Sequence, residues 1–116
     1  MAVEATAMTD PLCMLCPDEV QDQLFLGNSA EVLKRVPPNS VDLIITSPPY
    51  ADNRKRTYQG FPIDKYVELF LPIAAELKRV LKADGSFILN IKERAVEGER
   101  QTYVLELILA MKKQGW

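Results

Sequence analysis

The pattern of apolar and polar positions divides the chain after its first 22 residues. Residues 1–22 show no sustained strand or helix period, which is typical of an irregular leader. Beyond them, apolar runs and turn residues predict a strand over 24–26, a helix over 30–35 with Ser29 as its N-cap, and a strand over 41–46. The last of these is β-branched and apolar on both faces, as in a parallel strand that is covered on both sides.

The rest of the chain repeats this alternation of strand and helix. Apolar residues at helical spacing predict a long amphipathic helix, which Pro72 should kink or divide and which Asp84-Gly85 should end. The apolar positions of this helix are Ile63, Tyr66, Val67, Phe70, Ala74, Leu77 and Leu81. A strand is predicted over 86–92 and a helix over 99–113, closed by Gly115.

This order of elements predicts an α/β fold with a mostly parallel sheet and flanking helices. We expect residues 1–22 to be an irregular leader and residues 23–116 to belong to one domain. In open α/β sheets, function collects at the carboxyl ends of the strands. Two such ends carry polar residues here, one at Asn28 and one at Ser47 to Tyr50.

Composition and charge narrow the functional classes. The 116 residues are 47% hydrophobic and 26% charged, with a net charge of −2 and no histidine. The lack of histidine excludes Ser-His and Cys-His nucleophiles and most mixed zinc sites. The acidic balance argues against a bare nucleic-acid-binding module. Because no apolar run is long enough to span a bilayer and no secretory signal is evident, we expect a cytoplasmic protein without membrane contact.

Cys13 and Cys16 form a single Cys-x-x-Cys pair between two prolines in the leader. A zinc ribbon would need a second pair, so we predict no metal site. Three interpretations of this pair stay open: spectator thiols, half of a metal knuckle, or residues that result from the choice of start codon.

The residues that follow the strand over 41–46 have unusual chemistry. Two prolines fix the backbone, so the carbonyl oxygens around them should point in set directions without pairing to neighbours. Ser47 and the carbonyl of Pro48 can both accept hydrogen bonds from an exocyclic NH2 group, and Tyr50 offers a face on which a flat base can stack. The alternative is that Pro48-Pro49-Tyr50 is a rigid turn or a proline-rich ligand, but such a ligand should not follow a buried strand.

Thr46 to Tyr50 resembles motif IV of the S-adenosylmethionine-dependent DNA methyltransferases that modify amino groups, whose pattern is (Asp/Asn/Ser)-Pro-Pro-(Tyr/Phe/Trp). Residues 26–29 and 40–45 resemble the lead-in of the permuted β-type members, and 84–87 resembles their next strand entry. The resemblance covers roughly residues 24–116 and implies a partial Rossmann-like methyltransferase fold. It also implies S-adenosyl-L-methionine as cofactor, a restriction-modification setting, and double-stranded DNA with a flipped-out base as substrate.

The resemblance assigns roles to individual residues. It implies catalysis by Ser47, Pro48, Pro49 and Tyr50, and cofactor binding by Asn28, Thr46 and Ser47. Serine before Pro-Pro usually accompanies cytosine-N4 methylation in this family, so we expect that target, with adenine-N6 as the alternative. An RNA or protein amide acceptor also stays open. Asn28 stands where the family often has Asp near the cofactor adenine, or else simply adopts a turn conformation.

The basic run Arg54, Lys55 and Arg56 follows the catalytic loop directly. It either contacts DNA phosphates beside the flipped nucleotide or is a solvated surface run. Lys92 and Glu93 end the second core strand, and for these we predict a structural role or one in support of the site, rather than catalysis.

The five glycines form no Gly-x-Gly, so the family's glycine-rich cofactor loop is missing from these residues. We expect residues 23–116 to be the catalytic half of a methyltransferase domain, before the target-recognition and cofactor-loop segments. The other half or a second subunit is then a partner, a restriction endonuclease is a further one, and these 116 residues alone should bind S-adenosylmethionine weakly. The alternative is a catalytically silent interaction module.

Overall fold

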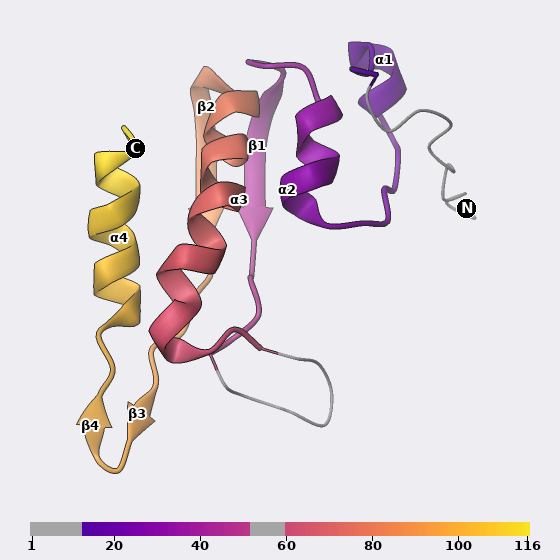
Figure 1. Cartoon of the computed structure of the whole chain (residues 1–116). Helices are drawn as coiled ribbons and strands as arrows, with labels where there is room; N and C mark the ends of the chain where they lie inside the picture. The colour runs from indigo at the N-terminus through magenta and orange to yellow at the C-terminus, as the bar shows by residue number, and fades with distance from the viewer. Residues whose placement is uncertain (1–12, 52–59) are drawn as a thin grey trace.

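The computed structural model describes residues 13–51 and 60–116 (Figure 1). Its helices are α1 (Pro17–Val20), α2 (Ser29–Val32), α3 (Tyr66–Val80) and α4 (Tyr103–Lys113), with 3-10 turns η1 (Leu33–Arg35) and η2 (Ile63–Lys65). Its strands are β1 (Val41–Thr46), β2 (Leu81–Leu89), β3 (Ala95–Val96) and β4 (Glu99–Arg100). None of the helices in this part of the chain is long and apolar enough to cross a membrane.

β1 and β2 form a parallel pair, joined through α3 in a β–α–β unit, which confirms the predicted α/β class. Leu43 to Thr46 lie opposite Ser86 to Leu89 in regular register, and the ladder continues where the Asn90 N–H donates to the Thr46 carbonyl at 2.9 Å. The register is interrupted between Val41 and Leu43. Gly85 lies at this interruption, where a Cβ would come within 2.7 Å of Leu81 Cδ1 and 3.0 Å of the Asp42 carbonyl, so only glycine fits without a shift.

The long helix α3 begins at Tyr66 and ends at Val80, four residues before the predicted stop at Asp84, because Leu81 already joins the ladder opposite Val41. Pro72 does not divide it. Proline removes the hydrogen bond to the carbonyl four residues earlier, that of Glu68. Both residues are exposed, so water can satisfy this carbonyl and the helix continues.

One hydrophobic core joins α3, α4 and, through Ala51, the predicted catalytic loop that follows β1. Its fully buried members fall on one face of each helix, at the spacing expected of amphipathic helices. They are Ala51, Tyr66, Phe70, Ala74, Tyr103, Val104, Leu107 and Met111. The end of α4 is a Schellman cap: Gly115 (φ 97°) and Trp116 donate to the carbonyls of Lys112 and Met111, which confirms the predicted closure at Gly115.

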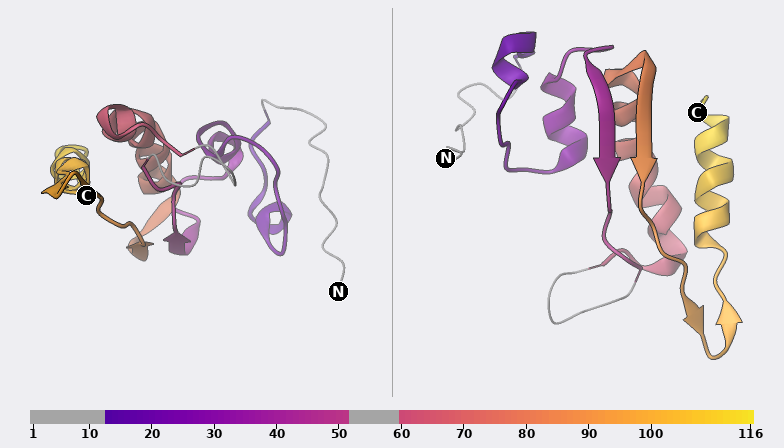
Figure 2. Two further views of the ribbon diagram at one scale, coloured as in Figure 1. Left: turned by 90° about the horizontal axis from the view of Figure 1, so that it is seen from below. Right: turned by 180° about the vertical axis from the view of Figure 1, so that it is seen from behind.

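The β1–β2 pair is covered on one face only, among the described residues. Seen from behind, both strands face the viewer with no helix in front of them (Figure 2). On that face Leu43 is 52%, Ile45 67% and Ile88 51% exposed. The expectation that the strand over 41–46 is covered on both sides is therefore wrong for these residues, although its composition suits a covered strand.

Two short predicted elements differ from the structure. The strand over 24–26 is wrong, because only an isolated bridge at Leu24 forms there. The helix over 30–35 forms as α2 followed by η1, but its cap is Asn28 rather than Ser29, since Asn28 Oδ1 accepts the Ala30 N–H at 2.9 Å.

The segment between β2 and α4 differs most from prediction. The strand over 86–92 ends at Leu89, and the helix over 99–113 begins only at Tyr103. In their place is a β3–β4 hairpin, whose turn residues Glu97 (φ 52°) and Gly98 (φ 82°) both have positive φ. A two-residue turn of this kind matches the twist of the paired strands, and its Gly98 comes directly before the start of the helix predicted over 99–113.

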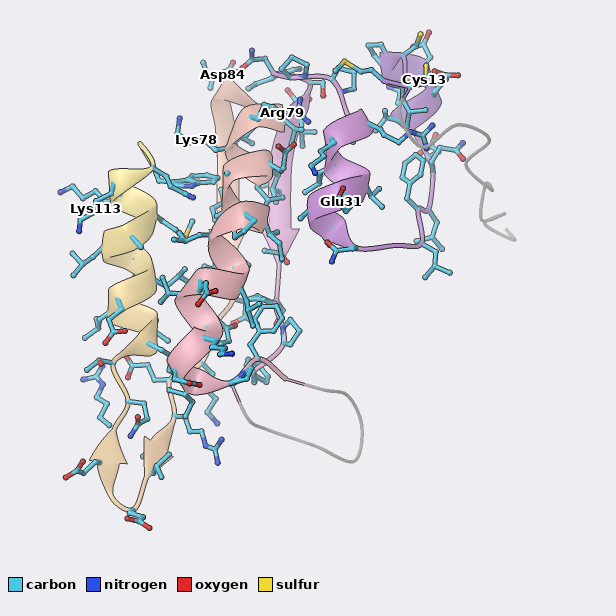
Figure 3. All side chains as sticks on the ribbon, in the orientation of Figure 1. Cys13, Glu31, Lys78, Arg79, Asp84 and Lys113 are labelled. Carbon is cyan, nitrogen blue, oxygen red and sulfur yellow. The ribbon has the colours of Figure 1, made fainter. Side chains whose placement is uncertain are left out.

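The end of the leader is tied to the rest of the chain. Leu15 N–H donates to the Arg35 carbonyl, and buried Arg35 donates through Nε to the Cys13 carbonyl. Arg79, labelled near the end of α3 in Figure 3, donates to the carbonyls of Leu33 and Val36 and so fixes η1 against α3. Part of the predicted leader also forms the turn α1, and the division of the chain at residue 22 stays a prediction.

Candidate active site

The predicted catalytic loop leaves β1 at its carboxyl end, beside the carboxyl end of β2 (Figure 1). Its residues differ in burial: Ser47 is exposed, Pro48 is buried, and Pro49 and Tyr50 are half-buried. The Thr46 carbonyl is occupied by the Asn90 N–H, so the loop separates from the sheet at Ser47. A serine hydroxyl is therefore presented outward while the following proline anchors the loop.

The carbonyl oxygens of the two prolines have different surroundings. The Pro49 carbonyl oxygen accepts a hydrogen bond from the Tyr66 hydroxyl at 2.8 Å. The expectation that both carbonyls stay unpaired is therefore wrong for Pro49. Among residues 13–51 and 60–116, no hydrogen bond uses Ser47 Oγ or the Pro48 carbonyl oxygen. The loop thus keeps two acceptors free on neighbouring residues, as binding of an NH2 group requires.

The far end of the loop is held from the other side. Ala51 is fully buried, and its carbonyl accepts a 3.2 Å hydrogen bond from Arg94 Nη1, beyond β2. Tyr103, at the start of α4, donates to the Lys92 carbonyl. Burial raises the pKa of the Tyr103 hydroxyl, and the charge of Glu93 adds to this, so the hydroxyl remains a donor at neutral pH.

A cavity of about 260 Å³ lies between the carboxyl end of β1 and α2. Of the predicted cofactor residues, Thr46 lines it, and Asn28 stands between two lining residues, Gly27 and Ser29. The Asn28 side-chain oxygen caps α2, which leaves its amide NH2 as a donor to a ligand. The remaining lining is largely apolar: Phe25, Val32, Leu33, Ile44, Ile45, Ile73 and Leu77.

The remaining sequence predictions concern Lys92 and Glu93, the basic run at 54–56, and the cysteine pair. Lys92 and Glu93 make contacts within the protein, and their role stays a prediction: the Lys92 carbonyl accepts a hydrogen bond from Tyr103, and Glu93 pairs with Arg100 at 2.5 and 2.6 Å. The basic run at 54–56 lies outside the described residues.

Cys13 and Cys16 are both exposed, free thiols. The charge of Glu19 raises the pKa of the Cys16 thiol, which disfavours the thiolate that metal binding and redox chemistry need. Within the described ranges, no cluster of three or more His, Cys, Asp or Glu could hold a metal.

Three residues near the loop escaped the sequence analysis: Tyr66, Arg94 and Asn90. Tyr66 appeared only as an apolar position of a helix, and nothing in its spacing reveals which carbonyl its hydroxyl reaches. Arg94 lies 43 residues from the carbonyl it binds, so local pattern could not find it. Asn90 could have been found, because in a parallel pair the residue after β2 must lie beside the residue after β1.

Comparison with known proteins gives the family. A family model described as DNA methylase, which covers N6 and N4 methyltransferases, matches residues 41–116, more than half of the chain. The Type II methyltransferase M.PvuII of Proteus hauseri is 33% identical over 90 residues, covering 76% of this chain and 27% of that enzyme. The DNA adenine methyltransferase YhdJ of Escherichia coli (strain K12) is 36% identical over 70 residues, covering 58% of this chain and 24% of that enzyme.

A solved structure agrees with this assignment. The PvuII DNA methyltransferase (cytosine-N4-specific) matches with a TM-score of 0.63 and 33% identity, over 77% of this chain and 32% of that chain. The chain therefore spans about a third or less of the proteins it matches. The α/β fold with its parallel strands is that of a partial methyltransferase domain. The chain belongs to the N6/N4 family of DNA methylases, the amino-group DNA methyltransferases.

Proposed function

We propose that this protein transfers a methyl group from S-adenosylmethionine to the exocyclic amine of a flipped-out DNA base. The single observation that carries the proposal is the pair of acceptors, Ser47 Oγ and the Pro48 carbonyl oxygen, left without partners among the described residues at the carboxyl end of β1. Family membership supplies the reaction class.

Each residue of the loop has its own role in the proposed reaction. The two N–H groups of the amine donate to Ser47 Oγ and to the Pro48 carbonyl, which draws the nitrogen lone pair out of conjugation and directs it toward the methyl donor. Tyr50 stacks on the base and fixes the plane of its ring. Because the Pro48 carbonyl is fixed by the backbone and Ser47 lies next to it in the chain, most of the acceleration comes from orientation rather than from a covalent intermediate.

The cavity beside β1 fits only part of the cofactor. Thr46 in the lining, and the amide of Asn28 between the lining residues Gly27 and Ser29, are the polar groups proposed for an adenine edge, and the apolar lining suits the ring itself. No carboxylate lines this cavity, and the sequence has no Gly-x-Gly. When bound, S-adenosylmethionine supplies the electrophilic methyl group. The rest of its binding site is, in our proposal, contributed by further methyltransferase segments or by a second subunit.

The preferred target is cytosine N4. Ser47 stands at the first position of the motif, and the solved structure that matches is titled cytosine-N4-specific. Adenine N6 is the alternative, since a DNA adenine methyltransferase is also among the relatives.

The remaining partners belong to the same proposal. Arg54, Lys55 and Arg56 directly follow the loop, where they would bind phosphates of double-stranded DNA beside the flipped base. A restriction endonuclease of matching specificity would accompany such a Type II enzyme in the cytoplasm. A catalytically silent interaction module is the second candidate, because the cavity beside β1 fits only part of the cofactor.

Methylation of DNA in cells tests the proposal. The protein is expressed, in the longest form that its reading frame encodes, in a host without its own cytosine-N4 or adenine-N6 methylation. The host DNA is then digested and its nucleosides are analysed by mass. N4-methylcytosine is the expected product. N6-methyladenine alone would overturn the choice of target, and neither product would favour the silent module.

A further inference from the structure

Two buried tyrosines pack against each other next to the predicted catalytic loop. Tyr66 is fully buried at the start of α3, and Tyr103 is 2% exposed at the start of α4. Their ring centroids are 4.8 Å apart at 48°, and Phe61 packs edge-on against Tyr66 at 5.4 Å. Burial on this scale fixes the ring positions, because a displaced ring would open a void in the core.

Each tyrosine reaches with its hydroxyl the loop that follows a different strand. Tyr66 donates to the Pro49 carbonyl in the loop after β1, at 2.8 Å. Tyr103 donates to the Lys92 carbonyl in the segment after β2. The packed tyrosine pair therefore connects the segments after β1 and β2 at the carboxyl edge of the sheet. The pair is anchored at the starts of α3 and α4.

The contact at Pro49 restricts the freedom that the loop still has. The proline rings fix φ at Pro48 and Pro49, and planar peptide bonds leave only ψ at these two residues. A hydrogen bond to the Pro49 carbonyl fixes ψ of Pro49, because that torsion decides where the oxygen points. It thereby sets the path of the backbone from the Pro48 carbonyl, which faces the substrate amine in our proposal, to the ring of Tyr50.

We propose that Tyr66 and Tyr103 are positioning residues for methyl transfer, with Tyr66 holding the acceptor loop and Tyr103 holding the neighbouring loop in register with it. This inference rests on the proposed function of Ser47 to Tyr50 and adds the residues that set the loop's geometry. By occupying the Pro49 carbonyl, Tyr66 also leaves the Pro48 carbonyl as the proline oxygen that is available to the amine. The role is indirect, since neither tyrosine needs to touch the substrate.

Tyr66→Phe tests the inference, because it removes the hydroxyl and keeps the ring. The matched control is Ser40→Ala, which removes another hydroxyl bond to a proline carbonyl, from Ser40 Oγ to Pro37 at 2.6 Å, at the opposite end of β1. In the longest form of the protein, we expect Tyr66→Phe to lower kcat about tenfold, with the Kd for S-adenosylmethionine unchanged. Ser40→Ala should change kcat by less than about twofold.

Other outcomes decide against the inference. If the wild-type protein methylates DNA and Tyr66→Phe keeps the wild-type kcat, or loses no more of it than Ser40→Ala, then Tyr66 has no positioning role. A loss of cofactor affinity equal to the loss of kcat would also overturn it, since that would indicate a general structural effect.

A readout that does not need activity separates this inference from the proposed function. In the 116-residue chain, the NMR resonances of the Pro49 carbonyl carbon and the Tyr50 amide should shift in Tyr66→Phe and stay in place in Ser40→Ala. If the wild-type protein transfers no methyl group, the proposed function fails. Unchanged resonances in Tyr66→Phe would show, independently of activity, that Tyr66 does not fix the loop.

Discussion

Ser47 supplies accessibility and Pro48 supplies rigidity, the two properties that the proposed amine-binding loop needs. Ser47 is exposed and carries a hydroxyl without a partner among the described residues, while Pro48 is buried and offers only its backbone oxygen. The proline ring fixes the direction of the chain, so the carbonyl does not depend on a side-chain rotamer. One mobile and one fixed acceptor can then adjust to an amine without losing the alignment of the loop.

Replacing the mobile acceptor should therefore slow the reaction without weakening the fold. We expect Ser47→Ala to lower kcat on the order of 10- to 100-fold in the longest form of the protein, because one of two hydrogen bonds to the reacting amine is lost. Methyl incorporation into DNA under saturating cofactor measures it.

Ser86→Ala is the matched control, since Ser86 is also an exposed serine and lies on the neighbouring strand β2. Its turnover should equal that of the wild type. Equal turnover in Ser47→Ala would remove Ser47 from the catalytic residues.

At the scale of elements, one ion pair at the surface spans the β3–β4 hairpin, and we expect the hairpin to depend on it. Arg100 binds both carboxylate oxygens of Glu93, at 2.5 and 2.6 Å, across the base of the hairpin. These hydrogen bonds hold the pKa of Glu93 below its ordinary value, and the charge of Arg100 adds to the shift. Each strand has only two residues, so few ladder bonds support the hairpin without the pair.

The depressed pKa gives the direction of the pH effect. A carboxylate with a lowered pKa contributes stability that is present above the ordinary Glu pKa, about 4.3, and is lost as the pH falls through the lowered folded value. We expect the cross-strand NMR contacts between Val96 and Glu99 to be complete at neutral pH and to weaken below about pH 4.

Arg100→Gln provides the control for this titration. Without the guanidinium, the hairpin contacts should already be weak at neutral pH and should respond little to acid. Contacts that persist in the wild type to about pH 2 would show that the turn at Glu97 and Gly98, rather than the ion pair, holds the hairpin.

At the scale of the whole molecule, the uncovered face of the β1–β2 pair sets the behaviour of the 116-residue chain. Leu43, Ile45 and Ile88 expose half or more of their surface there, and in the described part of the chain each of the two strands pairs only with the other. Apolar faces and unpaired strand edges both promote association. In the longer relatives, further segments are available to cover such a face.

We therefore expect the 116-residue chain to self-associate through this face. The double variant Leu43→Lys/Ile88→Lys should lower the mean mass in solution, measured by light scattering or sedimentation, because charged side chains cannot be buried in the contact. Leu26→Lys is the control, since Leu26 is 92% exposed but lies outside the sheet and should leave the mass unchanged. A monomeric wild-type chain would contradict the prediction.

The sequence by itself determined the family to which the chain belongs and the strand and loop that carry its motif. A β-branched run followed by Ser47-Pro48-Pro49-Tyr50 places a strand end, two fixed backbone bends and an aromatic ring within a few residues. Local rules of proline and hydrophobic period suffice for these features, and they predicted β1, most of α3, the core of α4 and the cap at Gly115. Short, marginal elements such as 24–26 were wrong, because their state depends on partners elsewhere in the chain.

Only the tertiary structure decided how the catalytic loop is held. Residues 17 and 43 positions away, Tyr66 and Arg94, occupy the carbonyls of Pro49 and Ala51, and no local pattern encodes such distant contacts. It also decided that Asn28 is a helix cap, and that one face of the sheet is uncovered among the described residues. The physical reason is the same throughout: the sequence lists the hydrogen-bonding groups, but burial and packing determine which of them are already paired and which remain for a ligand.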